Sequence, residues 1–171
     1  INDLSFSGMM FLMLQGRKPT LAQTRVLDAL LVASMEHGIA PPSMVARCFA
    51  SYGTSIQAAI SSGINAFGDR MGGLGEQMAK YMVDALQDMP SGRAPAAEII
   101  QNRAATLISE IITRGERVPG FGIPLHKADP RAIKVLEVAK RYGTFGLYGR
   151  FSEAMEAELT KARGGEHIPM N

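Results

Sequence analysis

His37 is the first residue whose type and setting suit chemistry. It stands between Glu36 and Gly38, where a predicted helix gives way to a turn. An imidazole in this position can donate a hydrogen bond to a substrate carboxylate or carbonyl. A histidine at a helix C-terminus can equally lie on the surface and interact with the helix dipole. The spacing alone leaves both roles open.

A glycine-rich stretch, Gly68-Asp69-Arg70-Met71-Gly72-Gly73, is the second candidate. The backbone N–H groups of such a turn, together with the Arg70 guanidinium, can bind an anion. The alternative is a plain hinge in which Asp69 and Arg70 form a salt bridge. On the first interpretation Arg70 is a substrate-binding residue.

The third candidate is the segment 118–131, whose two glycines and three prolines favour a loop over a helix or strand. Gly120 and Gly122 leave the backbone uncovered on both sides of Phe121, which suits a flat ring such as adenine. Arg131, in the first turn of the next predicted helix, can clamp a carboxylate with two parallel hydrogen bonds. A capped loop between two helices, without any ligand, is the alternative.

Other polar residues of this region have simpler interpretations. Asp129 followed by Pro130 predicts an N-cap and the first residue of a helix. His126 and Lys127 suit either surface charges or phosphate contacts, and we expect His126 to lie on the surface. We expect the same of His167, near the end of the chain.

The composition limits the classes of function. The chain has 171 residues, of which 46% are hydrophobic and 20% charged, with a formal net charge of +2. This length allows one substantial core or two small lobes. The charge is too small to indicate nucleic-acid binding. The sequence contains no metal-ligand cluster, no Walker loop and no supported Ser-His-Asp arrangement, so we expect no metal.

The single cysteine and the N-terminus bear on the compartment. Cys48 lies in an apolar run, which predicts a buried and unreactive thiol. One cysteine cannot form a disulfide within the chain, which fits a reducing compartment. No secretory signal is recognisable, and the apolar run Met9–Leu14 is too short to span a membrane. We therefore expect a cytoplasmic protein without a membrane partner.

Hydrophobic periodicity predicts an all-α chain, because no segment alternates with the period of a strand. The helix Leu21–Met35 is apolar around most of its circumference and is predicted to be mostly buried. The segment Ser55–Phe67 is nearly free of charge, which predicts burial on several sides and a subunit interface. Its small residues, such as Ala59 and Gly63, would let another helix approach closely. The other predicted helices contain or span Met9–Leu14, Met44–Ala50, Glu76–Asp88, Ala96–Arg114, Arg131–Arg141 and Gly149–Ala162.

Four motifs in order along the chain resemble those of the citrate synthase superfamily. They are Leu4-Ser5-Phe6 with Phe11–Thr20, the turn Met35-Glu36-His37-Gly38, the segment Ser61–Gly73, and the loop Val118–Arg131. Within the superfamily, these motifs resemble those of the citryl-CoA lyases and of the citrate-synthase-like end of ATP-citrate lyase. The resemblance runs the length of the chain.

The resemblance implies an all-α, citrate-synthase-like fold with a large and a small lobe, of which this chain is a part. Residues 1–73 would belong to the large, dimer-forming lobe. Residues 74–171 would form the small lobe, which carries the coenzyme A loop. It also implies a homodimer, which we expect to form through the Ser55–Phe67 helix.

The resemblance further implies chemistry at the α-carbon of an acyl-CoA thioester such as acetyl-CoA. A C–C bond to an oxo-acid such as oxaloacetate would be made or broken, without a metal or redox cofactor. By matched position His37 would contact the oxo-acid or citrate, and Arg131 would bind a carboxylate. The coenzyme A adenine would lie on the backbone of Val118, Pro119, Gly120, Phe121, Gly122 and Ile123.

The sequence departs from the family pattern at three places. Ile123 stands where the family carries the histidine that polarises the oxo-acid carbonyl, and the spacing from Ile123 to Arg131 is one residue short. Met71 replaces a histidine that citrate synthases proper carry and the lyase-like branch lacks. The family's catalytic aspartate would follow Asn171. The alternative to an active lyase or synthase is therefore a homologue that binds a CoA thioester but is catalytically impaired.

Overall fold

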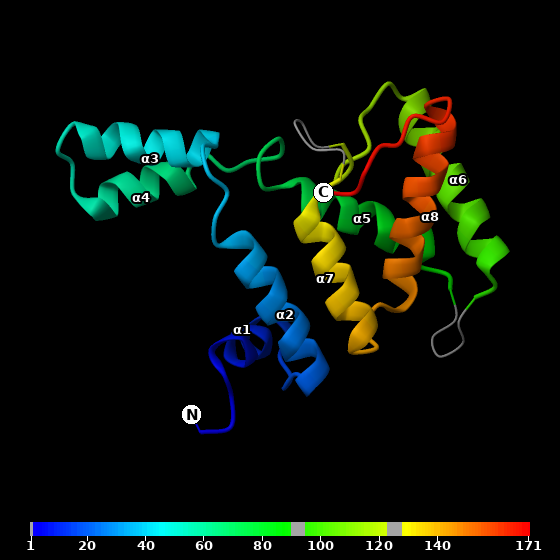
Figure 1. Ribbon diagram of the computed structural model, residues 1–171, viewed down its shortest axis with the longest axis horizontal. Helices are drawn as coiled ribbons and strands as arrows, with labels where there is room; N and C mark the ends of the chain where they lie inside the picture. The colour runs from blue at the N-terminus through cyan, green and yellow to red at the C-terminus, as the bar shows by residue number, and fades with distance from the viewer. Residues whose placement is uncertain (1, 90–94, 123–127) are drawn as a thin grey trace.

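The computed structural model describes residues 2–89, 95–122 and 128–171, and within these ranges it is helical (Figure 1). The only β pairing in the described part of the chain is three isolated bridges. The predicted all-α class is therefore confirmed. The helices are α1 (Phe6–Gln15), α2 (Leu21–Ser34), α3 (Pro41–Ser51), α4 (Ile56–Ile64), α5 (Leu74–Leu86), α6 (Ala97–Thr113), α7 (Pro130–Arg141) and α8 (Gly146–Ala162).

Several helices begin where a polar side chain satisfies the first free backbone N–H groups. The Ser5 hydroxyl accepts a hydrogen bond from the N–H of Gly8, which starts α1. Thr20 and Gln23 form a reciprocal capping box at the start of α2. Such caps stabilise a helix by about 1 kcal/mol each, which is why their sequence positions predict the starts well.

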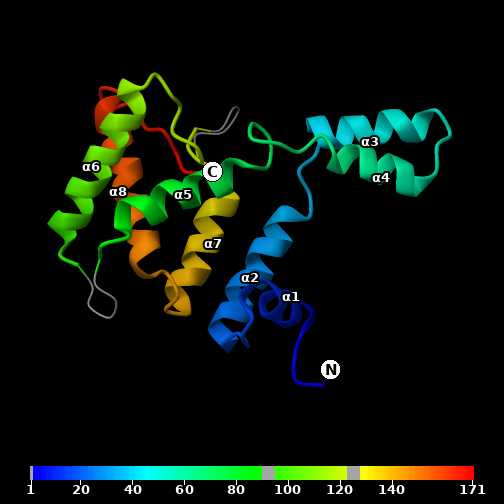
Figure 2. The same ribbon diagram turned by 180° about the vertical axis from the view of Figure 1, so that it is seen from behind.

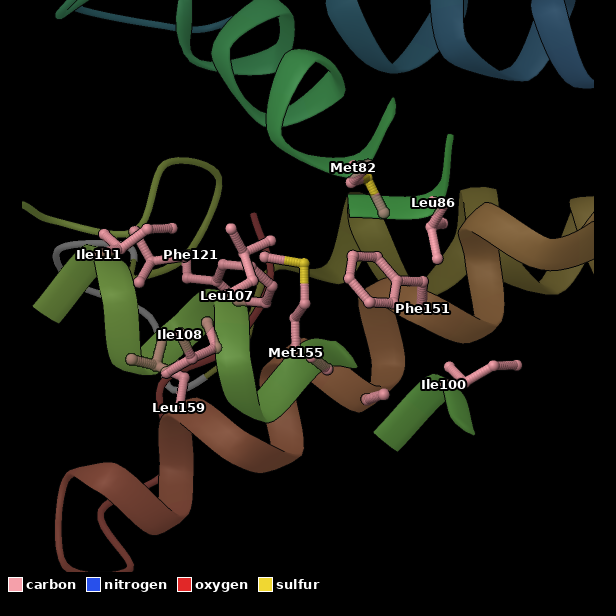
Figure 3. Close-up of a cluster of buried hydrophobic side chains, with 13 residues drawn as sticks. Met82, Leu86, Ile100, Leu107, Ile108, Ile111, Phe121, Phe151, Met155 and Leu159 are labelled. Carbon is pink, nitrogen blue, oxygen red and sulfur yellow. The ribbon is translucent and has the colours of Figure 1, made fainter. Parts of the chain in front are cut away.

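The main hydrophobic core lies in the second half of the chain (Figure 3). Side chains of α5, α6 and α8 meet there, and the largest fully buried ones are Phe151, Ile108, Ile111 and Met155. Every residue of this core, including the partly buried ones around it, falls between Met78 and Met170. The predicted division at residue 73 is compatible with this distribution and stays a prediction.

The first four helices make two smaller units. α1 packs on α2, whereas α3 and α4 form a hairpin that stands away from the rest of the molecule in both views (Figures 1 and 2). A Cβ atom at Gly63 would lie 2.9 Å from the carbonyl oxygen of Pro42 and 3.0 Å from the Cβ of Ala46. The close approach of α3 and α4 therefore depends on glycine, as the small residues predicted.

Three predictions about burial are wrong. α2 contains no fully buried residue. On α4, Ala59 and Gly63 are buried, but Ile56, Ile60 and Ile64 are 53–70% exposed. Cys48 is exposed rather than buried. The physical reason is the same in each case, because every one of these helices has an apolar face that no described residue of this chain covers. No described helix is long and apolar enough to cross a membrane.

Candidate functional site

The packing of α2 on α7 brings two of the predicted site segments together. The two helices run in opposite directions, so the end of α2 lies near the start of α7 (Figures 1 and 2). Glu36 follows α2, and Arg131 lies in the first turn of α7. The Glu36 carboxylate is near enough to contribute to the raised pKa of Arg131, after the larger effect of Asp129.

His37 lies in a short connection whose shape is fixed by two side chains. Glu36 Oε1 accepts a hydrogen bond of 2.5 Å from the N–H of Gly38. The Ser43 hydroxyl accepts from the N–H of Ala40 and donates to the carbonyl of Gly38, both at 2.9 Å. The His37 side chain is exposed between these fixed points. It is therefore presented to solvent on the side of the molecule where α2 meets α7.

Arg131 is already paired within its own helix turn. Asp129 Oδ1 accepts hydrogen bonds from the backbone N–H of Arg131 at 2.8 Å and from its Nε at 3.0 Å. Asp129 Oδ2 accepts from Nη2 at 2.6 Å. The Asp129 side chain is 2% exposed and the Arg131 side chain 42%. The N-cap predicted for Asp129 is confirmed, and the same carboxylate also binds the guanidinium, which the sequence analysis did not anticipate.

Hydrogen bonding from Arg131 is the largest cause that holds the pKa of Asp129 below its usual range, against the opposing effect of burial. The hydrogen bond to Asp129 in turn raises the pKa of Arg131. Both groups are therefore charged near neutral pH, and the buried carboxylate stays ionised because a cation is bound to it.

Arg70 lies at the tip of a tight turn. The N–H of Gly68 donates to the carbonyl of Met71 at 2.8 Å, and the N–H of Met71 donates back to Gly68 at 2.9 Å. Gln77 of α5 donates to the carbonyl of Asp69 at 2.8 Å, which ties the turn to the helix. The Arg70 side chain is exposed. Among the described residues no ion pair joins Asp69 to Arg70, so the simple salt-bridged hinge is not formed.

In the loop 118–122 the side chains face the core, and the two glycines are partly buried. Val118 and Phe121 are each 8% exposed and belong to the core. The N–H of Gly122 donates to the carbonyl of Pro169 at 2.8 Å, and the N–H of Asn171 donates to the carbonyl of Gly120 at 3.0 Å. The loop is thus held in place by the last residues of the chain.

Glu156 of α8 anchors those last residues. Its Oε1 lies 3.0 Å from Nε2 of His167 and accepts a hydrogen bond of 3.1 Å from the N–H of Met170. His167 is 57% exposed, in agreement with its predicted surface position. Glu156 was missed by the sequence analysis, because its partners lie 11 and 14 residues further along the chain. Nothing local in the sequence signals such a contact.

The structure therefore places Glu36, the neighbour of His37, within electrostatic reach of Arg131, and it separately pairs the 118–122 loop with the segment 169–171. Ile123, the sixth residue predicted for the coenzyme A loop, lies outside the described residues, as do His126 and Lys127. In the described ranges, no three His, Cys, Asp or Glu side chains are grouped so that they would hold a metal ion.

Residues 1–169 match the family model described as "Citrate synthase, C-terminal domain". The chain therefore belongs to the citrate synthase family. Among solved structures it is similar to the citryl-CoA lyase of Hydrogenobacter thermophilus, with 29% identity and a TM-score of 0.83 over 99% of this chain and 62% of that one. An ATP citrate lyase of Methanothrix soehngenii, solved with citrate and coenzyme A, shares the fold at 19% identity and a TM-score of 0.79, over 98% of this chain and 26% of that one.

A curated relative is the citrate synthase of Heyndrickxia coagulans, 28% identical over 96% of this chain and 42% of that protein. A putative citrate synthase 2 of Mycobacterium tuberculosis is 27% identical over 90% of this chain and 39% of that protein. The chain thus spans about two fifths of the length of these curated relatives.

The buried carboxylate of Asp129 predicts a specific dependence of stability on pH. Because its pKa is lower in the folded than in the unfolded state, its contribution is complete above the ordinary aspartate value of about 3.9 and is lost as the pH falls through the folded value. Asp129→Asn keeps an N-cap and removes the charge. At pH 7 we expect it to lower the free energy of unfolding by about 1 kcal/mol, a low value for an ion pair because Arg131 is 42% exposed.

Urea unfolding of parent and variant between pH 7 and pH 3 measures this difference. The gap should begin to close below about pH 4, where the carboxylate becomes protonated in the unfolded chain, and should close further as the pH falls through the lower folded value. Glu76→Gln, which removes an exposed pair with Lys80, is the control and should leave a smaller gap at pH 7. A gap for Asp129→Asn that stays constant down to pH 3 would contradict the assignment.

Proposed function

We propose that this chain is part of an enzyme that makes or breaks a C–C bond between the acetyl group of acetyl-CoA and oxaloacetate, as in citryl-CoA cleavage or citrate synthesis. His37 contacts the oxo-acid or citrate. Arg131 binds one of its carboxylates, and Arg70 is a further candidate for a carboxylate. Coenzyme A enters as the thioester of the substrate.

The observation that carries this proposal is the position of the His37 turn beside Arg131. The two segments are 94 residues apart in sequence, yet the packing of α2 on α7 puts Glu36 within electrostatic reach of Arg131. An imidazole and a guanidinium on neighbouring segments suit a ligand that has both a carbonyl and carboxylates. Reaction at the acyl α-carbon needs such donors to stabilise the negative charge that develops on oxygen.

The loop 118–122 is the proposed adenine site of coenzyme A. Val118 and Phe121 face the core, and the partly exposed Gly120 and Gly122 have no side chain that would cover a flat ring. Support also comes from the structural relatives, since the Methanothrix soehngenii ATP citrate lyase holds citrate and coenzyme A in its structure. Ile123 would continue this loop.

Ile123 also favours the second candidate function, a homologue that binds CoA thioesters but has little activity. An isoleucine supplies no hydrogen-bond donor where the family carries the carbonyl-polarising histidine. A donor of that kind is worth about 3–4 kcal/mol in related sites, or about two to three orders of magnitude in rate. The two functions share the coenzyme A site and differ in turnover.

His37→Ala in the full natural protein tests the first function. Loss of a donor to a carbonyl or carboxylate should lower the turnover of citryl-CoA cleavage about 30- to 1,000-fold. His167→Ala is the matched control, because His167 is exposed and Glu156 would still accept the N–H of Met170 without it. It should change turnover less than about threefold, the size expected for a surface charge.

His126→Ala completes the comparison and should also change turnover less than about threefold. If His126→Ala strongly lowers turnover and His37→Ala does not, the role given to His37 is wrong. If the parent cleaves no citryl-CoA but still binds acetyl-CoA, the second function replaces the first.

Gly120→Ala tests the coenzyme A loop. Gly120 has a φ of +78°, and a Cβ there would lie at ordinary contact distance from Met78, so alanine adds backbone strain without a clash. That strain, about 1–2 kcal/mol, should deform the loop and weaken acetyl-CoA binding about five- to thirtyfold in calorimetry.

Gly143→Ala is the control for this experiment, because Gly143 has a φ of +68° and nothing within 4 Å of its Cβ position. It carries the same kind of strain outside the loop and should leave acetyl-CoA affinity within about twofold. Equal affinity losses in both variants would show that strain anywhere in the chain has this effect, and the loop assignment would then fail.

We also propose a homodimer in which α4 lies at the interface, with residues 1–73 as the dimer-forming lobe and 74–171 as the small lobe. Ile56, Ile60 and Ile64, together with Phe67, form an exposed apolar stripe at helical spacing, and each is 53–70% exposed. A stripe of this kind in a soluble protein marks a contact surface. We further propose a cytoplasmic location, where an exposed free thiol such as Cys48 stays reduced.

Ile60→Asp in the full natural protein tests the dimer. A charge in the middle of the stripe should weaken the association at least about tenfold, because a buried carboxylate without a partner is costly. Ser61→Asp introduces the same charge one residue away, beside the stripe, and should leave the dimer intact. Sedimentation at micromolar concentration distinguishes the two, and a monomeric parent would overturn the proposal.

A further inference from the structure

Asp129 and Arg131 form a two-point contact whose geometry is more specific than a simple ion pair. Oδ1 and Oδ2 of Asp129 bind Nε and Nη2 of Arg131, at 3.0 Å and 2.6 Å. Oδ1 also accepts the backbone N–H of Arg131 at 2.8 Å. One buried carboxylate therefore fixes the plane of the guanidinium relative to the first turn of α7.

The contact with Asp129 uses one edge of the Arg131 guanidinium and does not use the N–H bonds of its end-on edge. A guanidinium carries five N–H bonds in a rigid planar fork. Asp129 takes the edge formed by Nε and Nη2. The end-on edge, formed by one N–H of Nη1 and the second N–H of Nη2, is suited to a second carboxylate, and the remaining N–H of Nη1 lies on the third edge, beside Cδ. With Asp129 2% exposed and the Arg131 side chain 42% exposed, the inner edge is covered and part of the side chain is accessible.

The charges around Arg131 make this arrangement informative. Asp129 neutralises the Arg131 charge, and Glu36 adds a second carboxylate whose field reaches Arg131. The three groups together carry a net charge of −1 near neutral pH. If net charge alone determined binding, these three groups would repel an anion. Arg131 therefore attracts a carboxylate through an oriented pair of hydrogen-bond donors rather than through a favourable electrostatic field.

We infer that Asp129 is a positioning residue, which holds Arg131 by its inner edge so that the outer edge binds a carboxylate of the substrate. The inference rests on the proposed function for the identity of the ligand, citrate or oxaloacetate. Asp129 itself does not touch the substrate. Its effect on binding passes through the orientation of Arg131.

Asp129→Asn distinguishes the positioning of Arg131 from an effect of net charge on anion binding and from a loss of folding stability. Asparagine is as good an N-cap as aspartate, so α7 should still begin at Pro130 and the melting temperature should stay within about 4 °C. The variant removes a negative charge beside Arg131, which on charge alone would tighten anion binding. An amide also cannot accept from both Nε and Nη2, because its nitrogen is a donor. Orientation of Arg131 therefore predicts weaker binding, the opposite sign.

The experiment measures citrate and acetyl-CoA affinities of the full natural protein by calorimetry. We expect Asp129→Asn to weaken citrate binding at least about tenfold and to leave acetyl-CoA within about twofold. Arg131→Lys, which keeps the charge but loses the fork, should weaken citrate similarly. The double variant should be no weaker than Arg131→Lys alone, because Asp129 acts through Arg131.

Three results would overturn the inference. They are citrate affinity that is unchanged or tighter in Asp129→Asn, equal losses for citrate and acetyl-CoA, and losses that multiply in the double variant. Failure of the proposed function gives a different result, in which the parent itself binds neither citrate nor acetyl-CoA.

Discussion

The arrangement of the candidate site depends on one buried carboxylate. Asp129 begins α7 by accepting a backbone N–H, and the same group binds the guanidinium of Arg131. Burying an ionised carboxylate is costly unless a cation and hydrogen bonds compensate it, and Arg131 supplies both. The start of the helix and the orientation of Arg131 are therefore set together. A change in either of them leaves a buried charge without its partner.

A second constraint concerns the first four helices, which expose many large apolar side chains. Each of α1 to α4 packs on one or two neighbours within the described residues, and the stripe on α4 faces outward. By contrast, α5, α6 and α8 share a core that includes the side chains of the 118–122 loop. The site joins these two parts, since the His37 turn follows α2 and Arg131 begins α7.

Sequence patterns predicted the local features well and the long-range ones poorly. The caps Thr20 and Asp129 were predictable because a cap is a contact within three residues. The small residues Ala59 and Gly63 correctly predicted the close approach of another helix to α4, but the lack of charge cannot tell whether its other face is covered by the same chain. The burial of Cys48 was mispredicted for the same reason. The clamp by Glu156 had no sequence signal, because its partners come close only when the last residues fold back over α8.

A crystal structure of the full natural protein with citrate and coenzyme A would show whether Asp129 positions Arg131 for the substrate. We expect a citrate carboxylate on the outer edge of Arg131, Asp129 on the inner edge, and His37 within hydrogen-bond distance of the same ligand. A citrate that displaces Asp129 from Arg131, or that binds without contacting Arg131, would contradict this expectation.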